Sequence, residues 1–125
     1  TPFDFKEFHE IGERIYEDHD QLKLAGGYDQ SFMVNDEEEQ LVLYDKETGR
    51  KMTMTTTLPC IQVYTGNFLS GGCNGKGGKP YENRDGVALE AQFLPNSIHI
   101  EEEPKVILRK GEEYEAVTTY RFEVE

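Results

Sequence analysis

Side-chain character alternates at every second residue in several short stretches of this 125-residue chain, which is the period of a β-strand. Examples are MTMTTT at 52–57 and YEAVTTYRFEV at 114–124. Successive side chains of a strand point to opposite faces, so such a run suits a strand with one buried face. Gly- and Pro-rich stretches such as GGCNGKGGKPY, at 71–81, separate the runs. Many short strands with such connections predict an all-β sandwich or barrel.

One short helix is expected near the N-terminus. Within residues 3–24, Phe8, Ile11 and Ile15 recur at helical spacing. Gly12 and the rising charge density keep this helix short.

A hairpin is expected around DKETG at 45–49, because Gly49 suits the left-handed position of a turn and extended runs flank it. In its second arm, Met52 and Met54 alternate with threonines, the pattern of a half-buried strand. We expect strands to cover most of three ranges in one domain: 28–65, 86–93 and 105–124.

The net charge of −12 disfavours nucleic acid and anionic membrane surfaces as partners, since phosphate neutralisation needs a basic patch. Seven Tyr and seven Phe argue for a folded chain. The sequence contains neither an apolar run of membrane-spanning length nor a recognisable secretory signal. It begins Thr1-Pro2 without an initiator Met, so we expect a processed chain or one that starts inside a longer gene product.

Two cysteines, Cys60 and Cys73, are too few for a disulfide framework and lack the spacing of a zinc site. They are expected to be reduced thiols in a cytoplasmic protein. The acidic clusters 36–39 and 101–103 lack the Gly-centred spacing of a calcium loop, so no metal is expected. The stretch GKGGK at 75–79 lacks the Ser/Thr and the following helix of a phosphate loop.

Polar side chains interrupt otherwise apolar strand segments at Glu90 and Gln62. Glu90 is either an outward-facing carboxylate in water or a partly desolvated general base on a concave sheet face. Gln62, like Gln92, either pairs across strands at a solvent face or binds the hydroxyls of a polyol. Asp29 follows Gly26-Gly27-Tyr28, where it either caps a turn or lies at the rim of a site.

In their order along the chain, several segments together resemble the aldose 1-epimerase (galactose mutarotase) family. They are TPFDF at 1–5, GGYDQSF at 26–32, YDKETGRKMTMTTTLPCIQVYTGNFL at 44–69, GKGGKPYENRDGVALEAQF at 75–93, and VILRKGEEYEAVTTYRF at 106–122. The resemblance implies that residues 1–125 are the C-terminal portion of a large twisted antiparallel β-sandwich. The N-terminal portion of that domain is absent from this sequence.

The resemblance also implies roles for three residues in the interconversion of α and β anomers of aldohexoses such as galactose and glucose. Glu90 would be the catalytic base, whereas Asp29 and Gln62 would bind the sugar. No cofactor is implied. The general-acid histidine of the family lies in the absent portion, and neither His9, His19 nor His99 matches it. The expected partner is therefore that N-terminal portion or a second copy of the chain.

Two departures from the family pattern put the substrate preference in doubt. Gln30-Ser31 replaces the usual His and Asn, and the segment LPNSIHIEEEP at 94–104 differs from the usual one. Two alternatives stay open: a non-catalytic sugar-binding β-sandwich, and a relative of the hexose-6-phosphate epimerases. A hexose-6-phosphate epimerase would need additional Arg or Lys residues around the groove, and 13 basic residues against 25 acidic ones give this alternative little support.

Overall fold

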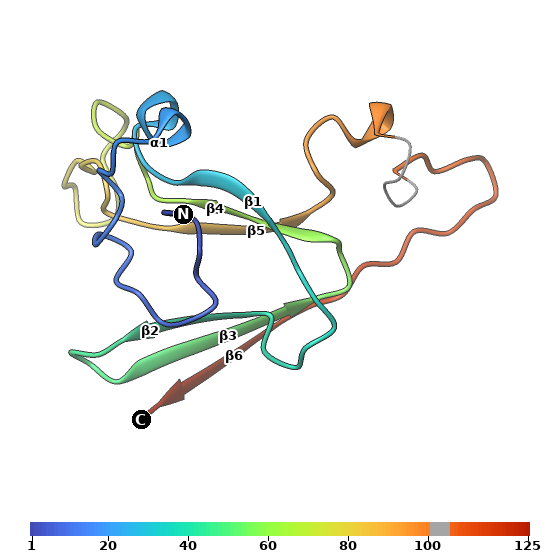
Figure 1. The fold of residues 1–125 in the computed structure, drawn as a ribbon, viewed down its shortest axis with the longest axis horizontal. Coiled ribbons are helices and arrows are strands. Elements are labelled where there is room, and N and C mark those ends of the chain that lie inside the picture. The colour runs from blue at the N-terminus through green and yellow to red at the C-terminus, as the bar shows by residue number, and fades with distance from the viewer. Residues whose placement is uncertain (101–105) are drawn as a thin grey trace. The chain divides into compact units, whose positions relative to one another are not determined.

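The structure is a computed structural model that describes residues 1–100 and 106–125. It contains two three-stranded sheets, in the orders β1-β4-β5 and β2-β3-β6, and one short α-helix (Figure 1). The elements are α1 (Asp20–Ala25), β1 (Asp29–Met33), β2 (Leu41–Asp45), β3 (Arg50–Thr56), β4 (Cys60–Tyr64), β5 (Ala88–Gln92), η1 (Ser97–His99) and β6 (Thr118–Val124). The prediction of an all-β fold with one short helix is confirmed.

The helix does not include the residues whose spacing predicted it. It begins at Asp20, after His19 caps its first turn through a hydrogen bond from the Gln21 N–H (3.3 Å). Residues 3–19 form turns and bends, and the Phe8 side chain is 72% exposed. Ile15 is nevertheless buried. A helical spacing of three residues was therefore too weak a signal beside Gly12 and the many charged side chains.

The last strand is shorter than predicted. Of residues 106–117 none belongs to a strand, and β6 begins at Thr118. Part of this segment is a turn, in which the Glu112 N–H donates to the Arg109 carbonyl (3.0 Å) and Gly111 takes a positive φ of 90°. Residues 101–105, which contain the acidic cluster 101–103, lie outside the described part of the chain. The 3-10 helix η1 was not predicted.

The predicted hairpin is present. β2 and β3 pair antiparallel, with Asp45 opposite Arg50, and Gly49 has the left-handed φ of 69°. The Asp45 carboxylate accepts hydrogen bonds from the Thr48 hydroxyl and the Glu47 N–H, and these bonds lower the pKa of Asp45. A turn that begins with Asp is stabilised in this way by its own side chain.

β3 is the central strand of its sheet. It was predicted to be half-buried, but at its centre both faces are buried. Thr53 and Met54 point to opposite faces, yet both are buried. β2 flanks β3 on one side and β6 flanks it on the other. The register places Leu43, Met52 and Phe122 in one row across the three strands.

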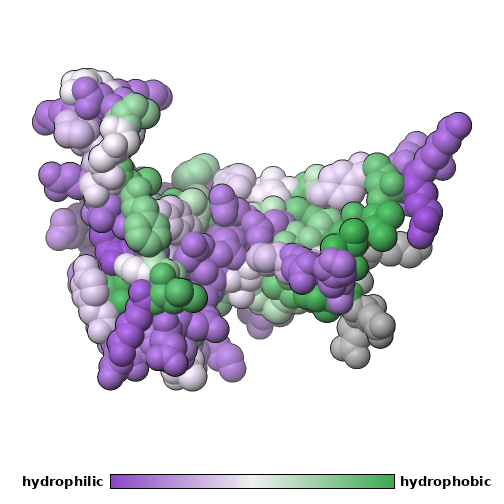
Figure 2. All heavy atoms as spheres, turned by 90° about the horizontal axis from the view of Figure 1, so that it is seen from above, coloured by the Kyte–Doolittle hydropathy of each residue, from purple (hydrophilic) through white to green (hydrophobic). Residues whose placement is uncertain are grey.

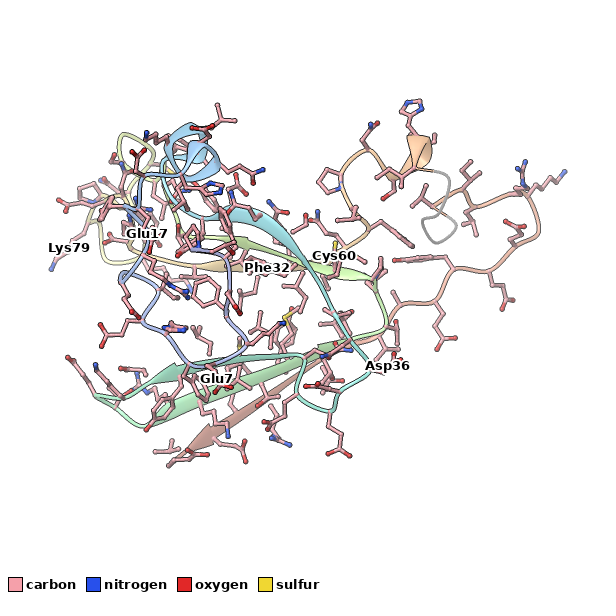
Figure 3. All side chains as sticks on the ribbon, in the orientation of Figure 1. Glu7, Glu17, Phe32, Asp36, Cys60 and Lys79 are labelled. Atoms are coloured by element: carbon pink, nitrogen blue, oxygen red, sulfur yellow. The ribbon has the colours of Figure 1, made fainter. Side chains whose placement is uncertain are left out.

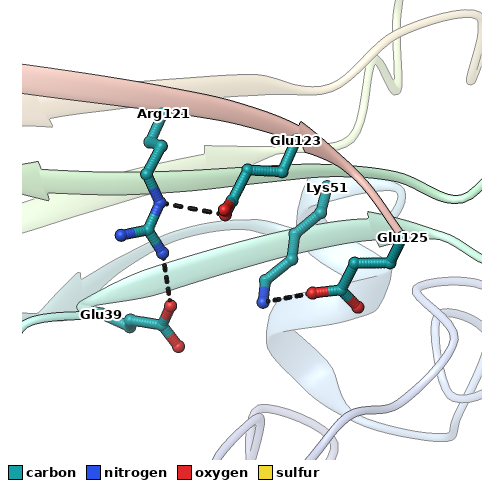
Figure 4. Close-up of polar contacts among 5 residues, drawn as sticks. All are labelled: Glu39, Lys51, Arg121, Glu123 and Glu125. Atoms are coloured by element: carbon teal, nitrogen blue, oxygen red, sulfur yellow. Dashed lines mark hydrogen bonds and ion pairs between the residues drawn. The ribbon is translucent and has the colours of Figure 1, made fainter.

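The other face of this sheet carries charged side chains of β3 and β6. Arg121 donates to Glu39 (2.8 Å) and to Glu123 (2.9 Å), and Lys51 donates to Glu125 (3.0 Å) (Figure 4). The bond to Glu125 raises the pKa of Lys51, and the bond to Glu123 raises that of Arg121. Ion pairs at the surface, such as those of Arg121, contribute little stability.

The chain forms two compact units. The first comprises Thr1–Gln30 and Gln62–Leu89, and the second comprises Ser31–Ile61 and Glu90–Glu125. In the first unit, Ile15, Leu22 and Tyr28 form a buried cluster, and three further side chains pack against it: Phe3, Phe5 and Ile11. Hydrophobic groups also reach the surface, where they gather in patches among hydrophilic ones (Figure 2). No helix in the described ranges could cross a membrane.

Candidate functional site

Two of the three predicted site residues touch each other. Asp29 begins β1 and Gln62 lies in the middle of β4, both within the first unit. The Gln62 side-chain amide donates a hydrogen bond to the Asp29 carboxylate, with 2.7 Å between Nε2 and Oδ1. Asp29 is exposed and Gln62 is half-buried. The pair therefore presents a carboxylate with a fixed orientation at the surface.

The backbone that leads into Asp29 is a tight turn at the end of α1. Gly26 caps the helix in a left-handed conformation, with φ of 69°. The Gly27 N–H then donates to the Leu22 carbonyl (3.0 Å). The Gly26 N–H donates to the same carbonyl. Hydrogen bonds of this kind satisfy carbonyls at a helix end and redirect the chain. The helix thus ends where the turn can deliver Tyr28 to the core and Asp29 to the surface.

Thr65 and Asn67, on either side of Gly66, hold the peptide groups of Tyr28. The Tyr28 N–H donates to the Thr65 hydroxyl oxygen (3.1 Å). The Tyr28 carbonyl accepts from the Thr65 N–H (3.1 Å) and from the Asn67 amide (3.0 Å). The Thr65 hydroxyl donates to Asn67 Oδ1 (2.7 Å), and both side chains are buried. Buried polar groups bonded in this way specify one backbone arrangement.

The phenol of Tyr28 fastens the same turn to the start of the chain. Its hydroxyl donates to the Pro2 carbonyl (2.9 Å), and its ring packs edge-on against Phe3 and Phe5. The side chain is 1% exposed, and burial raises the pKa of its hydroxyl. Tyr28 is thus the point at which the N-terminal segment and the Asp29 turn are joined.

Arg84 adds a cation to this network. Its guanidinium donates to the Gly26 carbonyl (2.5 Å), to Asn67 Oδ1 and to the Thr65 hydroxyl (3.3 Å). Arg84 was not among the predicted site residues, because nothing in the polar turn ENRDG at 82–86 distinguishes it from a solvated arginine. The burial of Thr65 and Asn67 could not be predicted from the sequence either, although their position beside Gly66 indicates a tight turn.

Glu90 lies at the centre of β5 in the second unit, and its side chain is exposed. Its neighbours Leu89 and Ala91 are half-buried. Exposure agrees with both readings of this residue, a strand carboxylate in water and a base that faces an open groove. Its role as the catalytic base stays a prediction.

The histidines have local partners. His9 Nδ1 lies 3.1 Å from the Glu13 carboxylate, and His19 caps α1 and packs edge-on against Phe3. His99 ends η1 and is exposed. Among the residues that the structure describes, no group of three or more His, Cys, Asp or Glu side chains could hold a metal ion. The buried Cys60 thiol donates to the Gln92 carbonyl (3.1 Å), and Cys73 is exposed.

The glycine-rich stretch 71–81 is a loop, as predicted. An isolated bridge joins Asn74 and Pro80, and the Gly75 N–H donates to the Lys79 carbonyl (2.8 Å). The Lys79 side chain extends outward from this loop (Figure 3). Since no helix follows, the loop lacks the helix N-terminus on which a phosphate loop depends.

Comparison with known proteins assigns the chain. Residues 1–121 match the family described as Aldose 1-epimerase. The chain is 34% identical to galactose mutarotase of Bos taurus over 99% of its length, and 36% identical to aldose 1-epimerase of Escherichia coli K12 over 98%. It spans 36% of the length of each of these relatives.

Solved structures agree with the fold. An aldose epimerase homologue from C. elegans superimposes with a TM-score of 0.78 at 24% identity, covering 99% of this chain and 37% of the other. Galactose 1-epimerase from Lactobacillus acidophilus superimposes with a TM-score of 0.61 at 29% identity, covering 74% and 26%. With most of its length matched by the family, this chain belongs to the aldose 1-epimerase family.

Proposed function

We propose that this chain supplies the base and part of the sugar site of an aldose 1-epimerase that interconverts the α and β anomers of hexoses such as galactose and glucose. The observation that carries the proposal is the contact between Asp29 and Gln62. The family resemblance independently implies that both residues bind the sugar. A carboxylate accepts several hydrogen bonds, so Asp29 can hold Gln62 and still accept from sugar hydroxyls.

Glu90 is the proposed base. Its carboxylate removes the proton from the anomeric hydroxyl, and that O–H electron pair becomes the second C1–O1 bond. The bond between C1 and the ring oxygen breaks, and the ring oxygen takes a proton from a general acid. Rotation about the C1–C2 bond of the open aldehyde, followed by reclosure, gives the other anomer. The acid is proposed to be a histidine of the preceding portion of the same protein.

Polarimetry on freshly dissolved α-galactose or α-glucose tests this assignment in the full-length protein. Glu90→Gln keeps the shape of the side chain but removes its basicity, so the enzymatic rate should fall about 100-fold or more while sugar binding persists. Glu47→Gln, in the exposed hairpin turn, is the matched control and should leave the rate unchanged. An unchanged rate for Glu90→Gln would remove this residue from the mechanism.

Two other functions predict different results in the same assay. A sugar-binding protein without catalysis would bind galactose or glucose, yet the wild-type protein would not accelerate mutarotation. A hexose-6-phosphate epimerase would accelerate the reaction of the phosphorylated sugar and leave the free sugar at its spontaneous rate.

The partner proposal rests on the exposed side of β6. Tyr120 is 47% exposed, Phe122 is 74% exposed and Val124 is 76% exposed. All three belong to an edge strand of the β2-β3-β6 sheet. Since relatives are almost three times as long as this chain, the proposed cover is the preceding portion of the same polypeptide. Association of a second copy through this strand is the competing outcome.

A further inference from the structure

Arg84 is bound to two separate segments of the first unit. Its guanidinium donates to the Gly26 carbonyl at the end of α1, and to Asn67 and Thr65 in the turn after β4. The backbone N–H of Arg84 donates to the Gly66 carbonyl (2.9 Å). The three oxygens that accept hydrogen bonds from the guanidinium are all uncharged. The planar, forked guanidinium thus acts as a cross-link between segments.

Two features show that the local backbone is shaped around this guanidinium. Gly27 has a φ of 151°, and a Cβ at this position would collide with Arg84 Nη1 and Asn67 Oδ1. Arg84 itself takes a left-handed backbone conformation, with φ of 78°, which is unfavourable for a residue with a side chain. Its guanidinium also lies over the Tyr16 ring, 5.3 Å from the centroid.

We propose that Arg84 is a positioning residue that holds the Gly26–Tyr28 turn against Thr65 and Asn67, and thereby fixes the direction in which Asp29 leaves the turn toward its sugar. The proposal rests on the proposed function of Asp29. Tyr28 is bonded through both of its peptide groups, so the Asp29 that follows inherits a fixed Cα position and direction. Without the cross-link, sugar binding must order the turn, which weakens the affinity.

The test uses the full-length protein and the variants Arg84→Gln, Arg84→Lys and Asp29→Ala, with Arg109→Gln as the exposed arginine control. Arg84→Gln should weaken hexose binding, measured by calorimetry, about tenfold, which corresponds to ~1.4 kcal/mol. It should raise KM with little change in kcat, because uniform binding is lost. Arg84→Lys should recover only part of the affinity, since an ammonium cannot span the three acceptors.

A double-mutant cycle separates positioning from general destabilisation. Adding Arg84→Gln to Asp29→Ala should weaken binding less than twofold further, because its effect passes through Asp29. Equal losses in the two backgrounds would overturn the proposal, as would full recovery of affinity by Arg84→Lys.

Hydrogen exchange gives a readout that does not depend on sugar. In Arg84→Gln the amides of Gly27 and Tyr28 should exchange at least tenfold faster than in wild type, whereas Arg109→Gln leaves them unchanged. If wild type binds no hexose, the proposed function fails and the exchange rates alone decide whether Arg84 clamps the turn. Unaltered exchange at Gly27 and Tyr28 overturns the clamp in either case.

Discussion

Replacing Tyr28 by Phe in the full-length protein removes one buried hydroxyl and changes how stability depends on pH. The ring remains, so its packing against Phe3 and Phe5 is kept. The lost interaction is the 2.9 Å hydrogen bond to the carbonyl of Pro2, itself a buried residue. A hydrogen bond of this kind contributes about 0.5–1.5 kcal/mol, and a buried carbonyl left without a partner adds to the cost. We expect Tyr28→Phe to lower the free energy of unfolding by about 1–2 kcal/mol at pH 8.

The pH dependence follows from the raised pKa of Tyr28. Burial holds the folded-state pKa above the ordinary value of 10.0. Between these two pKa values the folded state binds more protons than the unfolded state, so stability falls as pH rises. Below pH 10 the contribution is complete, and above it the wild type loses up to about 1.4 kcal/mol per pH unit until the folded pKa is reached. Tyr28→Phe cannot lose this contribution, so the gap between the two proteins should narrow above pH 10.

Urea unfolding curves at pH 8, 9.5, 10.5 and 11 measure this gap, because alkaline effects common to both proteins cancel in the difference. Tyr114→Phe is the control for removing an exposed phenol, and should change stability at pH 8 by less than about 0.5 kcal/mol. A gap between wild type and Tyr28→Phe that stays constant from pH 8 to 11 would refute the linkage argument.

Three further predictions concern the site, the hairpin and the isolated chain. Asp29→Ala and Gln62→Ala should each weaken hexose binding by about 1–3 kcal/mol in calorimetry, because a buried sugar hydroxyl loses its partner; undiminished affinity would exclude them from the site. Gly49→Ala should destabilise by at least about 1–3 kcal/mol, since φ is 69° and a Cβ would collide with the Glu125 carbonyl. Gly71→Ala, with φ of 84° and open space, is its control and separates strain from collision. Residues 1–125 alone should associate in light scattering and anomerise sugar poorly; a stable, active monomer contradicts both.

Features set by neighbours in sequence were predictable. The hairpin follows from a turn sequence and two alternating arms, and Gly49 takes the conformation expected of it. The helix lies at the end of the range 3–24 in which it was expected, but the spacing of Phe8, Ile11 and Ile15 does not mark it: Ile15 belongs to the core while Phe8 is exposed. Alternation upstream of Thr118 failed as a strand signal because that segment turns at Gly111.

The candidate site could not be predicted from local sequence patterns alone. Asp29, Gln62 and Glu90 could be singled out from the sequence, but only the family resemblance assigned them roles, since a polar residue in a strand has several ordinary explanations. Arg84 could not be named at all, because its partner Gly26 lies 58 residues away and nothing local marks the pairing. Long-range contacts between polar groups leave no periodic trace in a sequence.

The pairing of β3 with β6 bears on how the second unit folds. Thr56 pairs with Thr118, 62 residues away, and Arg50 pairs with Val124, 74 residues away. The β2–β3 hairpin closes over a short turn and can form within microseconds, whereas β6 must first be brought back across a long loop. Until it arrives, Met52 and Met54 lie on a strand with an open edge, which is the kind of surface that recruits other unfolded chains. Slowing the docking of β6 should therefore lower the soluble yield even where the final stability is unchanged.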